Sequence, residues 1–114
     1  MNWIIEPRRS GKTTELIMVC AETGGYIICH GQRDAARIFE QARHMGLDIP
    51  MPLTYFEFLS KSYYGFGVKQ FHIEDVDDLL RCLAGSVPIA TATLSPEARI
   101  YPRKYTEMGT EARN

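Results

Sequence analysis

A turn rich in glycine, lysine and threonine, placed directly after a short apolar run, constrains this chain more than any other feature. Residues 6–14 read Glu-Pro-Arg-Arg-Ser-Gly-Lys-Thr-Thr, and the run Trp3–Ile5 precedes them. The phosphate-binding pattern G-x-x-x-x-G-K-S/T matches at its last three specified positions, while Glu6 stands at its first glycine. Periodic apolar residues follow the turn, as in a helix that packs on a sheet. The sequence therefore predicts a strand, an anion-binding turn and a helix over residues 12–23.

The residues of the turn have separate physical roles in holding phosphate. Gly11 lets the backbone approach phosphate oxygens, Lys12 supplies a cation for the β- and γ-phosphates, and Thr13 offers a hydroxyl to Mg²⁺. Backbone amides at the start of the helix present its positive end to the anion. The alternative is a chance basic turn, and Glu6 leaves retained, weakened and lost nucleotide binding all open. The predicted nucleotide contacts are Arg8, Arg9, Ser10, Gly11, Lys12, Thr13 and Thr14.

Composition narrows the class of protein. A length of 114 residues with 45% hydrophobic and 24% charged residues is typical of one globular domain. A net charge of −1 gives no overall electrostatic case for binding nucleic acid or membranes. Three separated cysteines predict buried thiols in a reducing compartment, and Cys29–His30 is not accompanied by a second pair with zinc-ligand spacing. With no signal peptide and no apolar run long enough for a membrane span, we expect a cytoplasmic protein without a metal–thiolate site.

Strand and helix patterns alternate along the chain. This alternation predicts an α/β fold: a three-layer αβα arrangement with a mainly parallel sheet of four to five strands, in a domain over residues 1–105 with a polar tail at 106–114. Ligands of such sheets bind beyond the carboxyl ends of the strands. The predicted strands are 2–6, 26–30, 70–74, 87–94 and an edge strand at 100–101; the predicted helices are 12–23, 34–45, 55–61 and one that begins after Asp75.

Two adjacent acids, Glu74 and Asp75, end the third predicted strand. Either one is placed to contact Mg²⁺, directly or through water, while the other polarises an attacking water; with Lys12 they are the candidate catalytic residues. The alternative is that Asp75 is only a helix N-cap. Thr91, near the end of the fourth predicted strand, is a candidate sensor of the γ-phosphate, although alternating Thr and Ala also suits an ordinary strand.

Taken in order, the segments Pro7–Thr14, Glu74–Asp75 and Ala90–Thr93 resemble the P-loop NTPase superfamily, and in particular the small RecA-like ATPase domains of helicases and phage terminases. The similarity extends over about residues 2–95. It implies a P-loop fold in which a sensor strand lies between the strands that carry the two motifs. It also implies ATP, or another NTP, held with Mg²⁺ by Lys12, Thr13 and the acidic pair.

The chain departs from that family at several points, which leaves competing functions open. Glu6 replaces glycine, the acids appear as Glu-Asp instead of Asp-Glu, and the second domain of a motor is missing. We expect a viral or phage-type accessory factor that binds nucleotide, hydrolyses it slowly if at all, and acts through a protein partner or self-association in the host cytoplasm. One alternative is a degenerate, non-catalytic interaction module, such as an inhibitor or assembly factor.

Another alternative is an accessory protein that binds nucleic acid. The aromatic loop Tyr63–Phe66 lies between Lys61 and Lys69, and its rings suit stacking on single-stranded bases as well as packing on the sheet. Arg99 is the preferred arginine finger for a neighbouring site, against the alternative of ordinary solvated surface.

Overall fold

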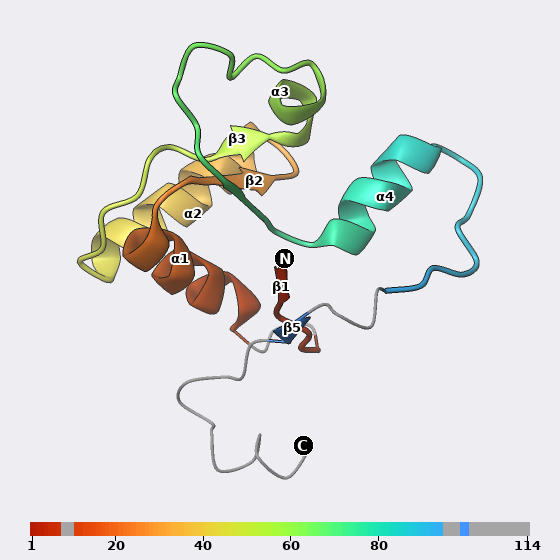
Figure 1. Ribbon diagram of the computed structural model, residues 1–114, viewed down its shortest axis with the longest axis horizontal. Coiled ribbons are helices and arrows are strands. Elements are labelled where there is room, and N and C mark those ends of the chain that lie inside the picture. The colour runs from red at the N-terminus through yellow and green to blue at the C-terminus, as the bar shows by residue number, and fades with distance from the viewer. Residues whose placement is uncertain (8–10, 95–98, 101–114) are drawn as a thin grey trace, which may run out of the picture.

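The computed structural model describes residues 1–7, 11–94 and 99–100. Strands and helices alternate along the chain, which confirms the α/β class (Figure 1). The predicted nucleotide contacts Arg8, Arg9 and Ser10, and the predicted polar tail at 106–114, lie outside the described residues. The elements are β1 (Asn2–Trp3), α1 (Lys12–Thr23), β2 (Tyr26–Cys29), α2 (Gln32–His44), β3 (Leu53–Thr54), α3 (Tyr55–Leu59), β4 (Phe71–Ile73), α4 (Val76–Ala84) and β5 (Arg99–Ile100).

The central sheet has three parallel strands in the order β3-β2-β4. Ile28 of β2 stands opposite Leu53 of β3 on one side and Ile73 of β4 on the other. The strands β1 and β5 form a separate parallel pair. The prediction of one sheet of four to five strands is therefore wrong within the described residues: the strand order is interrupted between β1 and β4.

Helices cover both faces of the central sheet. Successive side chains of β2 point to opposite faces, and the consecutive apolar residues of this strand therefore need a packed layer on each side. Ile27 and Cys29 pack with residues of α1 and α2 in one fully buried cluster, which includes Ile17 and Ile38. On the other face, Ile28 packs in a second cluster with residues of β3, α3 and α4. Helices on both sides of a parallel sheet are typical of α/β domains, so the layered arrangement follows from the apolar runs of the sequence.

The fourth predicted strand is absent. Residues 87–94 have no regular secondary structure, and every residue of this segment is exposed. The apolar side chains of Val87, Ile89 and Leu94 are 68%, 45% and 51% exposed. The segment has the apolar residues that predicted a strand, but it pairs with no strand of the described structure. Apolar residues favour a strand only where they pack against neighbouring strands, and this segment has no such neighbour among the described residues.

None of the helices in the described part of the chain is both long enough and apolar enough to span a bilayer.

Candidate functional site

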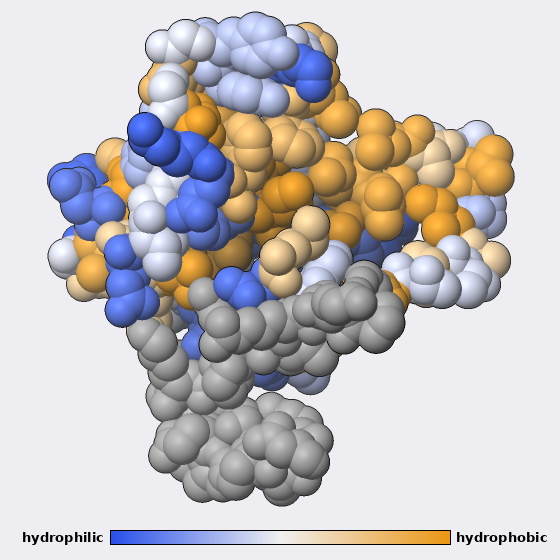
Figure 2. Space-filling model, viewed as in Figure 1, coloured by the Kyte–Doolittle hydropathy of each residue, from blue (hydrophilic) through white to orange (hydrophobic). Residues whose placement is uncertain are grey.

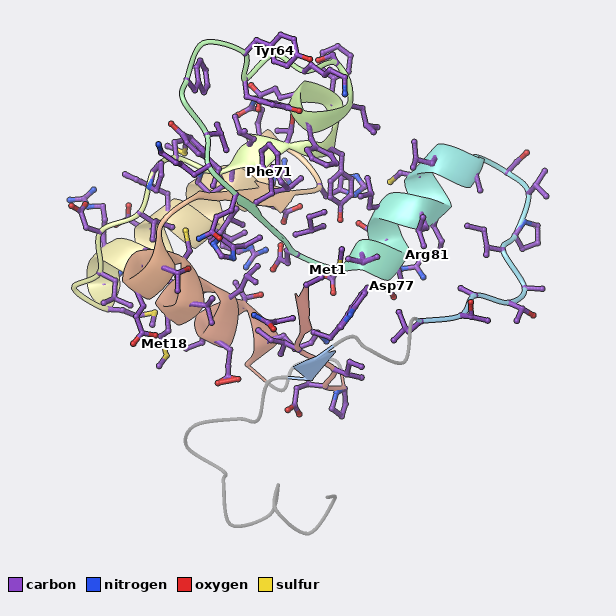
Figure 3. The ribbon with its side chains drawn as sticks, in the orientation of Figure 1. Met1, Met18, Tyr64, Phe71, Asp77 and Arg81 are labelled. Atoms are coloured by element: carbon purple, nitrogen blue, oxygen red, sulfur yellow. The ribbon has the colours of Figure 1, made fainter. Side chains whose placement is uncertain are left out.

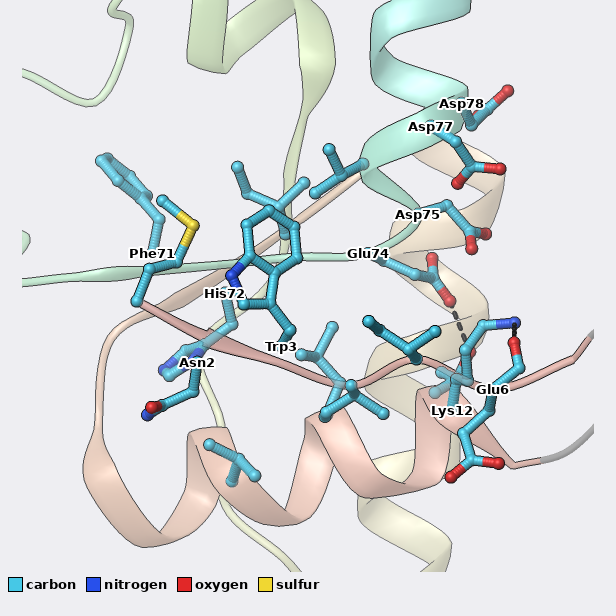
Figure 4. Close-up of a pocket in the computed structure, with 18 of the residues that line it drawn as sticks. Asn2, Trp3, Glu6, Lys12, Phe71, His72, Glu74, Asp75, Asp77 and Asp78 are labelled. Carbon is cyan, nitrogen blue, oxygen red and sulfur yellow. Dashed lines mark hydrogen bonds between the residues drawn. The ribbon is translucent and has the colours of Figure 1, made fainter. Parts of the chain in front are cut away.

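A hollow lies between β1, α1, β4 and the start of α4, and both predicted halves of the site line it (Figure 4). The first half is the turn at Gly11–Thr14, and the second is the acidic pair Glu74–Asp75. Gly11 is the N-cap of α1 and has φ of 92°, in the left-handed region that glycine adopts at no steric cost. The turn therefore enters the helix through a position that requires glycine.

The two halves are joined by a direct contact. Thr13 Oγ1 donates to Glu74 Oε2 over 2.5 Å, although the two residues are 61 positions apart in the sequence. Glu74 is fixed by its backbone, because its N–H donates to Ile28 O at 2.9 Å and its carbonyl accepts from Tyr55 Oη at 2.9 Å. The structure thus brings into contact two side chains that the sequence assigned to the two halves of the site.

Burial raises the pKa of the Glu74 carboxyl above its ordinary value. The hydrogen bond from Thr13 and the charge of Arg37 oppose this shift, and the neighbouring charges of Asp75 and Asp34 add to it. Glu74 is therefore a half-buried carboxylate that would gain from a cation beside it.

The Lys12 ammonium faces back along the chain. Lys12 Nζ donates to Glu6 O at 3.0 Å and to Pro7 O at 3.1 Å. Figure 4 shows the Glu6 carboxylate pointing away from both Lys12 and Glu74. The residue that replaces the first glycine of the pattern thus holds the lysine through its main-chain oxygen, and its carboxylate does not occupy the space beside Glu74.

Asp75 follows Glu74 in an unusual backbone conformation. It is the N-cap of α4, as predicted, but its φ is 58° and its side chain makes no capping hydrogen bond. Its carboxylate is exposed and borders the hollow. Of the two predicted acids, Glu74 is thus the one that contacts the turn, while Asp75 is open to solvent.

Three other polar residues, Thr14, His72 and Thr91, belong to the segments that predict the site. Two of them have hydrogen-bond partners within the fold, and the third lies outside the hollow. Thr14 Oγ1 accepts from Gln41 Nε2 at 2.9 Å, which ties α1 to α2. His72 Nε2 lies 2.7 Å from Gly24 O, consistent with a packed strand residue. Thr91 is exposed and does not border the hollow, although residues 92–94 of the same segment do. The strand predicted to carry Thr91 is absent from the described residues, and its role as a sensor stays a prediction.

The charge of the hollow decides what it can hold. Among the described residues that line it, the carboxylates include Glu74, Asp75, Asp77 and Asp78, while the side-chain cations are Lys12 and Arg81. A bare triphosphate would be repelled by this excess of negative charge. The oxygens of Thr13 and Glu74 are the donor type that Mg²⁺ prefers. The residues present thus fit a magnesium-bound anion better than an anion alone.

The sequence analysis missed Tyr55 as a supporting residue. Its hydroxyl lies 2.9 Å from Glu74 O and 3.2 Å from Asp75 O, and the side chain is 5% exposed. The capping-box pattern predicted a helix starting at residue 55, but the partners of Tyr55 depend on the register of β3 and β4 with β2, which no local pattern specifies.

No family model, no curated protein and no solved structure matches this chain.

Proposed function

We propose that this chain is a small P-loop domain that binds ATP, or another nucleoside triphosphate, together with Mg²⁺. The observation that supports it most is the contact between Thr13 and Glu74. A hydroxyl at the start of a helix and a carboxylate at the carboxyl end of a parallel strand are oxygen donors of the type that holds magnesium beside phosphate. Here they lie together beside a left-handed glycine turn.

In this proposal the residues of the turn change partners when nucleotide binds. The Lys12 ammonium leaves the carbonyl oxygens of Glu6 and Pro7, which are weak partners compared with phosphate oxygens. The amides at the start of α1 hold the phosphates, and the helix has the length needed for a positive N-terminal end. Thr13 and Glu74 hold the cation between them.

Hydrolysis, where it occurs, would be slow. Bound Mg²⁺ would neutralise charge on the phosphates. With Glu74 on the cation, Asp75 is the candidate that polarises the attacking water. Asp75 is exposed, so a water molecule beside its carboxylate would exchange with bulk solvent more readily than one beside a buried acid. We therefore expect nucleotide binding to be measurable more readily than turnover.

The finer fold that we propose for the nucleotide-bound state is a continuous parallel sheet. Ala92–Leu94 already border the hollow that separates β1 from β4. Within the described residues, the buried indole nitrogen of Trp3 has no hydrogen-bond partner, and it belongs to the same hollow. A strand formed by residues 87–94 would fill this space, cover their exposed apolar side chains and supply carbonyl acceptors.

The test is calorimetric titration of the full chain with ATP, with and without Mg²⁺. We expect binding only with Mg²⁺, a loss of at least about tenfold in affinity in Lys12→Ala and in Glu74→Gln, and no change in Lys69→Ala. Lys69 is the matched control because it is an exposed lysine outside the hollow. Absence of binding at millimolar nucleotide, or equal binding by all variants, would overturn the proposal.

A non-catalytic interaction module is the second candidate, and exposed apolar side chains favour it. Phe56, Tyr64 and Phe66 are 76%, 73% and 54% exposed. Figure 2 shows hydrophobic residues spread over the side of the molecule where α4 lies, and Leu83 of α4 is 56% exposed. A protein partner or a second copy would cover such surface. Light scattering that shows a concentration-dependent dimer, together with no nucleotide binding, would favour this function.

A further inference from the structure

Three metal-binding side chains converge between the end of β2 and α4. His30 follows β2 directly, and Asp78 and Cys82 lie four residues apart on α4. His30 Nδ1, Asp78 Oδ2 and Cys82 Sγ all lie within 4.8 Å of one another. The nitrogen is 2.8 Å from the carboxylate oxygen and 3.8 Å from the sulfur. Of these three side chains only Asp78 borders the hollow, and none is a ligand in the nucleotide site proposed above.

The arrangement does not suit a cysteine–histidine catalytic relay. In such a relay the thiol faces one ring nitrogen and the carboxylate orients the ring through the other. Here the carboxylate of Asp78 and the thiol of Cys82 both approach Nδ1 of His30. Three different donor atoms around one point are instead the arrangement found around a metal ion.

We propose that His30, Asp78 and Cys82 bind Zn²⁺, with water or an external ligand in the fourth position. Tetrahedral zinc with ordinary bond lengths separates nitrogen from oxygen by about 3.4 Å and nitrogen from sulfur by about 3.6 Å. The present nitrogen–oxygen and nitrogen–sulfur separations of 2.8 and 3.8 Å differ from these by about 0.6 Å or less, and the oxygen and sulfur lie within 4.8 Å of each other. A thiolate and an imidazole select zinc over magnesium, which prefers oxygen ligands.

The surroundings leave the required atoms accessible. The His30 side chain is 57% exposed and Cys82 is exposed, so a hydrated ion can reach both. Asp78 presents Oδ2 to His30, while its other oxygen, Oδ1, lies 3.8 Å from Arg81 Nη2. The Tyr55 hydroxyl lies 3.3 Å from Asp78 Oδ2 and is placed to orient the carboxylate, the role that outer hydrogen-bond partners have at metal sites.

A zinc ion here would fasten α4 to the central sheet. Leu79 is the buried residue of α4, and Leu80 and Leu83 on the same helix are 37% and 56% exposed. Through the metal, α4 would be tied to the carboxyl end of β2, and binding free energy would add to the stability of the folded state. The sequence predicted no metal–thiolate site because no second Cys/His pair has zinc-ligand spacing. His30 and Asp78 are 48 positions apart, so no local spacing reveals them.

The experiment uses cobalt as a spectroscopic probe, followed by competition with Zn²⁺, on the reduced full chain. We expect Co²⁺ to give a thiolate charge-transfer band that disappears on addition of Zn²⁺. Cys82→Ser should abolish the band, and His30→Ala and Asp78→Asn should each weaken metal binding by more than the roughly 10–100-fold that loss of an outer partner costs. His44→Gln, at an exposed histidine of α2, should bind like the unmodified chain.

Two results would overturn the proposal. One is a chain that gives no cobalt band and no zinc-induced rise in melting temperature at millimolar metal. The other is undiminished metal binding by Cys82→Ser with unchanged circular dichroism, which would place the metal elsewhere. Lys12→Ala is expected to retain zinc binding, so failure of the nucleotide proposal and failure of the zinc proposal can be told apart.

Discussion

At the residue scale, two adjacent glycines between α1 and β2 have different reasons to be glycine. Gly24 and Gly25 both have positive φ, at 87° and 99°. A Cβ at Gly25 would lie 2.6 Å from Gln70 O, whereas a Cβ at Gly24 would meet nothing within 4 Å. Gly25 therefore combines a backbone requirement with a close approach of the β4 segment, and Gly24 has the backbone requirement alone.

The first prediction compares these two positions. Gly25→Ala should lower the free energy of unfolding by roughly 2–4 kcal/mol, since it adds a steric clash to left-handed strain. Gly24→Ala is the matched control: with φ of 87° and ψ of −180° it occupies a region essentially confined to glycine, and it should lower the free energy of unfolding by roughly 1–3 kcal/mol, less than Gly25→Ala. Urea denaturation of both variants provides the measurement. Equal losses at the two positions would show that the approach of Gln70 has no energetic consequence.

The second prediction concerns the cysteines. Burial raises the pKa of the Cys29 thiol from 9.0 to about 12, and the charge of Glu74 adds to the shift. Above about pH 9 the unfolded chain releases the Cys29 proton while the folded chain keeps it. The contribution of this thiol to the free energy of unfolding is therefore present in full below about pH 9 and declines as the pH rises above it.

The burial of Cys29 can be tested by alkylation. At neutral pH, alkylation of the native protein should modify exposed Cys82 fast and buried Cys29 only after unfolding. Rapid native labelling of Cys29, read by mass spectrometry, would contradict the predicted burial.

At the element scale, local signals predicted the helices well. The predicted helix over residues 12–23 agrees with α1, since glycines stand on both sides of an apolar-periodic segment. The strand predicted at 87–94 is absent from the described structure although the segment carries apolar residues. A strand needs a neighbouring edge to pair with, and the location of that edge depends on contacts between segments far apart in the sequence.

The third prediction tests a helix cap. Thr54 Oγ1 accepts from Glu57 N at 3.1 Å, and Glu57 Oε1 accepts from Thr54 N at 2.8 Å, so α3 begins with a complete capping box. Thr54→Val keeps the size of the side chain but removes the acceptor, and it should lower the free energy of unfolding by about 1 kcal/mol. Thr54→Ser retains the acceptor and should unfold at a higher urea concentration than Thr54→Val. The reverse order would contradict the capping role.

Charge on α4 shows the limit of reasoning from one element. Asp77 and Arg81 lie on one side of this helix (Figure 3), with Asp77 Oδ2 3.4 Å from Arg81 Nη1. Spacing of four residues predicts such a pair from sequence alone. The neighbouring Asp78 also pairs with Arg81, with Oδ1 3.8 Å from Nη2, while its other oxygen contacts His30, which follows β2. Helical spacing therefore gives the pairs within α4, while the contacts that join α4 to the sheet require the tertiary structure.

At the scale of the whole molecule, the α/β class could be predicted from the alternating strand and helix patterns, and both residues of the Thr13–Glu74 contact could be identified as candidates from the sequence. The break between β1 and β4, which places them in separate sheets, could not be predicted. Trp3 is the only tryptophan of the chain, and its indole faces the hollow at that break, so its fluorescence reports on this region directly.

The fourth prediction is that residues 87–94 become ordered when the site fills. Magnesium–ATP should slow amide hydrogen exchange across this segment and shift the emission of Trp3, because the indole nitrogen gains an acceptor. Amides of the exposed loop at 64–67 serve as the control and should not change. Unchanged exchange at 87–94 in the nucleotide-bound protein would show that the two sheets stay separate.

The central claim is that the turn after β1 and the end of β4 form one magnesium–nucleotide site. Backbone amide NMR of the full chain, titrated with Mg·ATP, tests it most directly. We expect the resonances of Gly11, Thr13 and Glu74 to shift together along one binding curve, and Lys12→Ala to abolish all three shifts. Shifts confined to other parts of the protein, or none at millimolar nucleotide, would contradict it.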